Sequence, residues 1–133
     1  MGLFVRGHLE GLSSKATNNK LQIKRPLRIV DAWDYLNDVC FDGEMIRPTF
    51  KVWLNLQMVT KGKKYKLLGC YDKSPKEKKG IIWISYKHED NSQLETLFHE
   101  MVHQYINEVL DDKNYHHHGT LFWDIYYERM ERL

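Results

Sequence analysis

The 133-residue chain has few cysteines, no long hydrophobic run and almost no excess charge. Its two cysteines, Cys40 and Cys70, are too few for a disulfide framework or a four-cysteine zinc ribbon, so we expect two buried, reduced thiols. No apolar run approaches the ~18 residues of a membrane-spanning helix. The amino terminus shows no secretory signal, and Arg6 stands where a myristoylation motif requires Ser or Thr. We therefore expect a cytoplasmic protein with no membrane partner, in the host cytoplasm if the chain is viral.

The small net charge also bears on partners. Twenty basic and 18 acidic side chains leave a formal charge of +2, which is too little to indicate a nucleic-acid-binding protein by bulk charge alone. Hydrophobic residues make up 42% and aromatic residues 13%, which argues against disorder. At ~150 residues per domain, the length predicts one domain, and we expect it to be monomeric.

The first half of the chain reads as a helix followed by strands. Apolar residues at three- and four-residue spacing predict a helix from about 27 to 41, which Asp42-Gly43 ends. Strand-like runs follow at 49–56, 65–71 and 80–86. In the first of these, the alternation places four apolar side chains on one face: Phe50, Val52, Leu54 and Leu56. Short basic connectors at 60–64 and 73–79 make an antiparallel meander the simplest topology.

The second half reads as two helices. Ser92-Gln93-Leu94-Glu95 forms a capping box, and an amphipathic pattern then continues to Val109. A last helix is predicted from about Gly119 to the end of the chain. Together these elements predict an α+β domain over 26–133, with an N-terminal helix, a three-stranded antiparallel sheet and two further helices. Residues 1–25 form a poorly specified segment whose apolar residues fit either an edge strand or a short helix.

The second helix carries the pattern His99-Glu100-Met101-Val102-His103. Two histidines four residues apart are displaced by about 40° around a helix axis, so they share one face and can converge on one metal ion. Glu100 projects about 100° from His99, toward the edge of that face. This arrangement suits zinc-dependent hydrolysis, because the metal lowers the pKa of a water molecule toward ~7 and the carboxylate takes the proton.

A catalytic zinc ion usually has three protein ligands, so a third must come from elsewhere. The metzincin position, six residues after the second histidine, is Val109 here. The remaining candidates are three consecutive histidines and one later glutamate: His116, His117, His118 and Glu128. Tyr105 and Tyr115 also lie near the motif in sequence, and a tyrosine hydroxyl can donate a hydrogen bond to an oxyanion. We expect Tyr105 to pack in the core, because it falls on the apolar face of the helix.

These residues resemble the SprT-like zinc metalloproteases, which include Spartan. In that family an HEMxH helix is followed by an HGxxF motif, which is similar to His118-Gly119-Thr120-Leu121-Phe122 here. The resemblance implies a zincin-like fold, one zinc ion per chain bound by His99, His103 and His118, and Glu100 as general base. It also implies that Gly119 gives a tight turn and that Phe122 packs in the core.

The resemblance further implies an endopeptidase with a protein substrate, and it raises DNA-associated proteins as a substrate class. Many members carry a four-cysteine zinc ribbon after this domain, so we expect a minimal form without that ribbon. A zinc hydrolase acting on a cell-wall peptide is an alternative, which the missing export signal disfavours.

Lysine-rich connectors motivate a different function. Eight lysines fall on or beside the predicted hairpin loops, including Lys66 and Lys73. The six candidate binding residues among them are Lys61, Lys63, Lys64, Lys76, Lys78 and Lys79. Lysines there can bind nucleic-acid phosphates, with nearby tyrosines stacking on bases. They can equally serve to keep hairpins soluble and to protect sheet edges. Because successive loops of a meander lie at opposite ends of the sheet, we expect two patches. The alternative function is therefore a non-catalytic nucleic-acid-binding domain, with DNA as partner.

Overall fold

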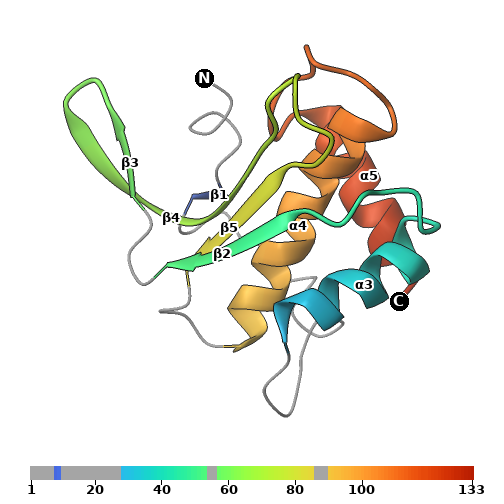
Figure 1. Ribbon diagram of the computed structural model, residues 1–133. Coiled ribbons are helices and arrows are strands. Elements are labelled where there is room, and N and C mark those ends of the chain that lie inside the picture. The colour runs from blue at the N-terminus through green and yellow to red at the C-terminus, as the bar shows by residue number, and fades with distance from the viewer. Residues whose placement is uncertain (1–7, 10–27, 54–56, 86–89) are drawn as a thin grey trace.

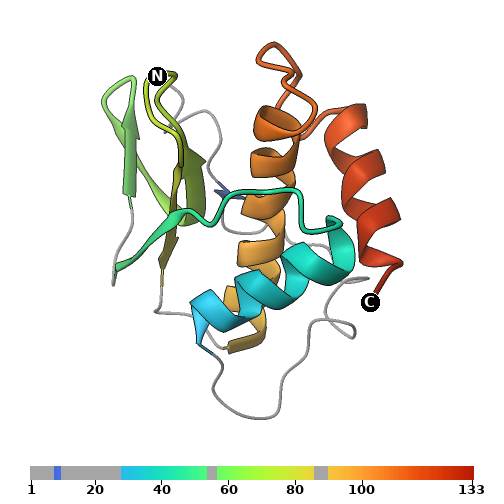
Figure 2. The same cartoon turned by 45° about the vertical axis from the view of Figure 1, so that its right-hand side comes forward.

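The computed structural model describes residues 8–9, 28–53, 57–85 and 90–133 of the chain. These segments form strands and helices that make an α+β fold, which confirms the predicted class (Figure 1). In chain order the elements are β1 (His8–Leu9), α3 (Ile29–Cys40), β2 (Thr49–Trp53), β3 (Gln57–Thr60), β4 (Lys63–Asp72), β5 (Ile81–Ser85), α4 (Asp90–Glu108) and α5 (Thr120–Met130). The three helices lie on the same side of the sheet (Figure 2).

The sheet is mixed, so the predicted antiparallel meander is wrong. The strand order is β1-β4-β5-β2. β4 pairs with β5 in the antiparallel direction, but β2 pairs with β5 in the parallel direction, with Lys51 opposite Trp83. The reason is that β2 does not turn back onto the strand that follows it. The chain instead forms the β3–β4 hairpin first, and β5 then separates β4 from β2.

The β3–β4 hairpin is longer than the sequence predicts. Its turn consists of Lys61 and Gly62, which have φ values of 51° and 75°. Two successive residues in the left-handed region are typical of the two-residue turn that matches the twist of a hairpin. The flanking residues of the expected loop at 60–64 are therefore strand, with Thr60 opposite Lys63. The hairpin projects away from the helices (Figure 1).

The edge strand β2 does not bury the face that its alternation predicts. Phe50 is half-buried and packs edge-to-face against Trp33 of α3, with ring centroids 6.4 Å apart. Val52, two residues further on, is 47% exposed. Leu54 and Leu56 lie outside the described residues. Of the predicted apolar face, Phe50 thus joins the core and Val52 faces solvent.

The first helix agrees closely with its prediction. α3 ends at Cys40, and the backbone N–H of Gly43 donates to the Asn37 carbonyl over 2.8 Å. Asp42 and Gly43 both have positive φ, which lets the chain leave the helix sharply. The Asn37 side chain then exchanges two hydrogen bonds with the Met45 backbone.

α4 is the central helix of the fold. It contacts α3, α5, β4 and β5, and every residue from 94 to 107 is buried. It begins at Asp90, two residues before the predicted cap, so Ser92 lies inside the helix and is not its N-cap. Buried apolar side chains of α4 join those of α3, α5 and the sheet in one core.

The last helix is held against α3 by a partly buried arginine. Arg129 of α5 donates to the Tyr105 hydroxyl over 2.7 Å and to the Cys40 carbonyl over 3.2 Å. Its guanidinium also stacks over the Tyr105 ring, 4.5 Å from the centroid. Arg132 and Arg129 both pair with Asp42 at the end of α3. These contacts join α5 to the end of α3 and to Tyr105 of α4.

Both cysteines are free thiols and are buried, as predicted. Burial raises the pKa of the Cys40 thiol to about 11. Of the predicted N-terminal segment 1–25, only His8–Leu9 is described, as an edge strand that pairs with β4. The loop expected at 13–20 lies outside the described residues. Among the helices that the structure describes, none is long and apolar enough to cross a membrane.

Candidate metal centre

The two histidines of the HEMVH motif lie on the buried part of α4. His99 and His103 are one helical turn apart, and their ring centroids are 5.3 Å apart. Both side chains are almost completely shielded from solvent. A buried imidazole needs a partner for its ring nitrogens, because an unsatisfied polar group inside a protein is costly. Their burial therefore indicates that other groups meet them inside the fold.

His118 meets them from the loop between α4 and α5. It is in the left-handed region with φ of 62°, a conformation that costs a residue with a side chain about 1 kcal/mol. The next residue, Gly119, has an ordinary φ of −86°, but a Cβ there would lie only 2.8 Å from the His116 Cβ. The expected tight turn is present, because the Gly119 N–H donates to the His116 carbonyl over 3.0 Å and closes a turn over residues 116–119. The left-handed residue that turns the ring toward α4 is His118 itself.

The three Nε2 atoms converge. The His118 Nε2 lies 2.8 Å from that of His99 and 3.2 Å from that of His103. The ligand atoms of the three residues all lie within 4.8 Å of one another. A metal ion with ~2.0–2.1 Å bonds and tetrahedral angles would hold its nitrogen ligands about 3.3 Å apart. The cluster is close to that spacing, so these three side chains can bind a metal ion.

Phe122 packs beneath all three imidazoles. Its ring centroid lies 4.6 Å from that of His99, 4.5 Å from that of His103 and 5.1 Å from that of His118. It is fully buried and belongs to the core, as expected. The apolar ring limits the tilt of each imidazole and keeps water from that side of the cluster.

Glu100 is fully buried next to the first histidine. Burial raises its pKa well above the usual range, and the backbone amide of Tyr71 acts in the opposite direction. Neither carboxylate oxygen accepts a hydrogen bond of good geometry from the described part of the chain. Gly69 of β4 faces this carboxylate, since a Cβ at that position would lie 3.3 Å from the Glu100 Oε2. Such a carboxyl group is costly to bury unless a cation or a ligand engages it.

The other candidate ligands do not reach the cluster. Glu128 is exposed on α5 and forms ion pairs with Arg129 and Arg132. His116 is exposed, while His117 is half-buried with its ring centroid 5.8 Å from that of His103. Neither is part of the metal-binding group in the described residues. Burial, followed by the charge of His117, lowers the pKa of His118 to about 4, so this histidine is neutral at pH 7.

The structure also gives the two tyrosines their roles. Tyr105 is in the core, as expected, and its hydroxyl accepts a hydrogen bond from Arg129. The Tyr115 hydroxyl lies 2.6 Å from the His103 Nδ1. Sequence reasoning missed this second contact, because Tyr115 stands in a polar loop with no pattern that points to a partner.

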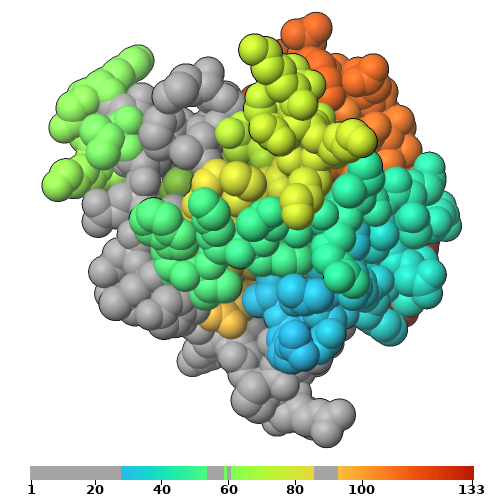
Figure 3. Space-filling view, viewed as in Figure 1, coloured from blue at the N-terminus to red at the C-terminus, as the bar shows by residue number. Residues whose placement is uncertain are grey.

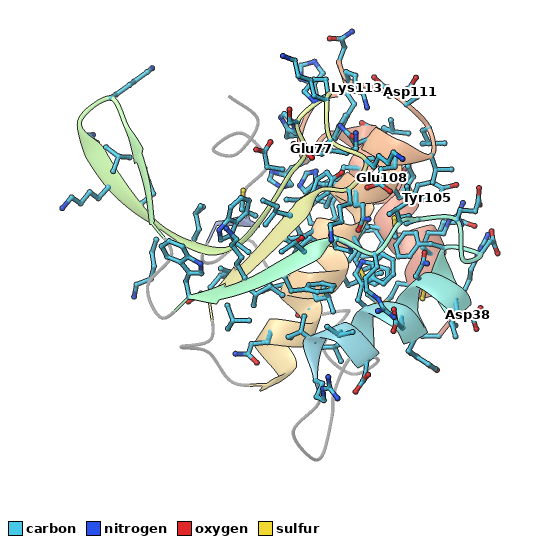
Figure 4. All side chains as sticks on the ribbon, viewed as in Figure 1. Asp38, Glu77, Tyr105, Glu108, Asp111 and Lys113 are labelled. Carbon is cyan, nitrogen blue, oxygen red and sulfur yellow. The ribbon has the colours of Figure 1, made fainter. Side chains whose placement is uncertain are left out.

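A network of buried polar side chains around Gln104 was also missed. Gln104 accepts a hydrogen bond from the Trp33 indole and donates to the Ile46 carbonyl and to Glu108. Glu108 also accepts from the Tyr71 hydroxyl, 3.1 Å away. Figure 4 labels Tyr105 and Glu108, which both come from the second half of α4. This network fixes the rotation of α4 relative to α3 and the sheet, and thereby the direction of its histidines.

The six candidate lysines lie in two separate places. At the tip of the β3–β4 hairpin, Lys61 lies in the turn, and Lys63 and Lys64 begin β4. The loop after the end of β4 carries the others, which are Lys76, Lys78 and Lys79. All six are exposed, and ten residues of strand span about 30 Å if extended. In Figure 3 the hairpin and the 73–80 loop form separate projections, in agreement with the two expected patches.

Comparisons with protein-family models, with curated proteins and with solved structures find no match to this chain.

Proposed function

We propose that this chain is a zinc-dependent endopeptidase of the SprT-like type, with one zinc ion held by His99, His103 and His118. The observation that carries the proposal is the convergence of three imidazole Nε2 atoms beside a fully buried carboxylate on the same helix. Nitrogen ligands in this number and spacing suit a catalytic zinc ion, which keeps one position open. The resemblance of the HEMVH and HGTLF motifs to SprT-like proteases supports the same assignment.

The side chains of the proposed site have separate roles. A bound zinc ion supplies a Lewis acid that polarises the scissile carbonyl and lowers the pKa of water. Glu100 accepts the proton of the attacking water and returns it to the leaving amine. Burial raises the pKa of Glu100, so its ionised form would be a stronger base, and a zinc ion in the site would favour that ionised form. Phe122 shields the imidazoles from water, which strengthens the interactions in the site.

Protein is the proposed substrate class, and DNA-associated proteins are the narrower proposal. The narrower proposal rests on the family resemblance together with the exposed lysines of the β3–β4 hairpin and of the loop that follows β4. Fold and site by themselves do not select a substrate sequence.

The first experiment measures zinc and peptidase activity on purified protein. The wild type and three variants are compared: Glu100→Gln, His118→Ala and Glu128→Gln. Glu128→Gln is the matched control, because it makes the same chemical change on an exposed glutamate of α5. Zinc per chain is determined by elemental analysis, and cleavage of an unfolded protein such as casein is followed with and without single-stranded DNA.

We expect about one zinc ion per chain in the wild type, in Glu100→Gln and in Glu128→Gln, and a clear loss of zinc in His118→Ala. Loss of a general base reduces turnover by about 10²–10⁴-fold, so Glu100→Gln should lose almost all cleavage while Glu128→Gln keeps it. Cleavage by Glu100→Gln at the wild-type rate would contradict the mechanism. A wild type that takes up no zinc after addition of the metal would contradict the assignment as a whole.

A second candidate function is nucleic-acid binding by the hairpin patch, defined as Lys61, Lys63 and Lys64. The specific observation is that the exposed lysines lie in the turn and at the start of β4, in a hairpin that projects from the body of the fold (Figure 1), next to Tyr65, which is 38% exposed. Lysines contact phosphates, and a neighbouring aromatic ring can stack on a base. The loop patch of Lys76, Lys78 and Lys79 lacks such a ring within its own segment.

The two patches provide matched variants for the test. Charge reversal to glutamate at all three lysines of the hairpin patch is compared with the same reversal in the loop patch. We expect salt-dependent binding of labelled single-stranded DNA by the wild type, lost in the hairpin variant and largely kept in the loop variant. An equal loss of DNA binding in both variants would show that only the overall charge of the protein matters. A wild type that does not bind DNA at low salt would contradict this second function.

A further inference from the structure

The loop between α4 and α5 brings two groups to the metal centre. One is the ligand His118, and the other is Tyr115, which is 8% exposed and lies three residues earlier. The Tyr115 hydroxyl is 2.6 Å from the His103 Nδ1, which is a short hydrogen bond between two buried groups. The His103 Nε2, on the other side of the ring, points to His118. Both nitrogens of His103 are therefore engaged, one by the cluster and one by Tyr115.

The direction of this hydrogen bond depends on the metal. An imidazole whose Nε2 binds a metal ion through its lone pair carries its proton on Nδ1. His103 must then donate to the Tyr115 oxygen. Without a metal, the hydroxyl can donate to Nδ1 instead, with the proton on Nε2. A phenol hydroxyl can both donate and accept a hydrogen bond, so Tyr115 can pair with the His103 Nδ1 with or without the metal ion. A phenyl ring at this position can form neither hydrogen bond.

The loop is itself held in place at several points. The Asp112 backbone N–H donates to the Ile106 carbonyl, and the Asn114 N–H donates to the Asp112 side chain. The Lys113 ammonium donates to both the backbone and the side-chain oxygen of Asn107. Figure 4 labels Asp111 and Lys113 in this loop beyond the end of α4. Tyr115 thus reaches His103 from a segment whose backbone is anchored to α4.

We infer that Tyr115 is a positioning residue of the metal centre, which holds the His103 ring with its Nε2 lone pair directed at the metal ion. The inference rests on the proposed zinc site and adds to it a residue that no metal-binding motif contains. Groups that hold a metal-ligating histidine through its second nitrogen are typically worth 10–100-fold in metal affinity.

The test compares zinc affinity in Tyr115→Phe and Tyr105→Phe. Tyr105 is the matched control, because it is also a buried tyrosine with a hydrogen-bonded hydroxyl, but its partner is Arg129 and not a metal ligand. Zinc dissociation constants are measured by competition with a chromophoric chelator, and thermal unfolding of the metal-free proteins is recorded in parallel. We expect Tyr115→Phe to bind zinc 10–100-fold more weakly and Tyr105→Phe to bind within about threefold of the wild type.

A second measurement needs no variant. In the zinc-loaded wild type, long-range ¹H–¹⁵N spectra report which ring nitrogen of His103 carries the proton. We expect a protonated Nδ1 whose proton shows a nuclear Overhauser effect to the Tyr115 ring. Wild-type zinc affinity in Tyr115→Phe, an equal loss in both variants, or an unprotonated Nδ1 would each overturn the inference while leaving the zinc site in place. Failure of the wild type to bind zinc would instead overturn the proposed function.

Discussion

Replacing Gly69 with alanine tests how closely the sheet packs against α4, the helix that bears His99 and His103. A Cβ at this position would lie 2.5 Å from the Thr96 Cγ2, 3.0 Å from the Trp83 carbonyl oxygen and 3.3 Å from the Glu100 Oε2. Carbon atoms in contact prefer a separation of about 3.5–4.0 Å. The added methyl group therefore requires β4 and α4 to move apart by about 1 Å, or the Thr96 side chain to rotate.

The size of the effect follows from the crowding. Overpacking a well-filled core costs about 1–3 kcal/mol. An unfolding entropy of ~2.1 cal/mol/K per residue amounts to about 0.28 kcal/mol/K for a chain of this length. The melting temperature of Gly69→Ala should therefore fall by about 4–11 °C. Thermal unfolding of the metal-free protein, followed by circular dichroism, measures this change separately from any effect on metal binding.

A double-mutant cycle separates the effect of crowding on stability from other effects of the alanine side chain. Thr96→Ser removes the Cγ2 atom that the new methyl group meets, so the double variant should recover part of the lost stability. Gly62→Ala is the control, because Gly62 has a positive φ but no atom within 4 Å of its added Cβ. It should lose about 1–2 kcal/mol through backbone strain, and Thr96→Ser should not rescue it. A coupling between Gly69→Ala and Thr96→Ser below about 0.5 kcal/mol would refute the reasoning.

Two further predictions concern the helix junction and the thiols. Arg129→Met should cost about 1–3 kcal/mol, because it removes the donor of the Tyr105 hydroxyl and leaves the Cys40 carbonyl with only the longer hydrogen bond from Arg132, at 3.4 Å. Arg132→Met removes a more exposed ion pair and should cost at most about 1 kcal/mol; equal costs in urea titrations would contradict this account. Burial raises the pKa of Cys40 to about 11, and Cys70 is also buried, so neither cysteine should react with a thiol reagent at pH 8 until the chain unfolds. Rapid labelling of the folded protein would show that this assignment of burial is wrong.

Local patterns in the sequence were sufficient for most helices and for the shared face of His99 and His103. The third histidine of the cluster, His118, was expected from the family resemblance, because the residues alone also left His116, His117 and Glu128 as candidates. The spacing of His99 and His103 needs only the regular period of one helix, and Asp42-Gly43 marks the end of α3 through its own backbone preference. The two-residue turn at Lys61-Gly62 also follows from local sequence, although the strand residues on either side of it were predicted to be part of a loop.

Pairing over long distances could not be predicted in the same way. No feature of β2 itself shows that its partner is β5, about thirty residues later, and that the two run in parallel. The polar residues of α4 look like a solvent-facing side, but other elements cover them, so Gln104 is a buried hydrogen-bonding residue. Tyr115 became recognisable as a partner of His103 once the fold had brought together residues 12 positions apart.

The unbroken burial of residues 94–107 on α4 has a consequence for how this protein can be altered. In a saturation mutagenesis experiment, most substitutions at these positions would lower abundance and activity together, and a change that keeps the shape of the side chain, such as Glu100→Gln, is the exception. Most other variants that change activity at constant abundance should come from the exposed hairpin and from the loops around the site. An engineer who wishes to redirect this protein would therefore leave α4 unchanged and diversify the segments that surround it.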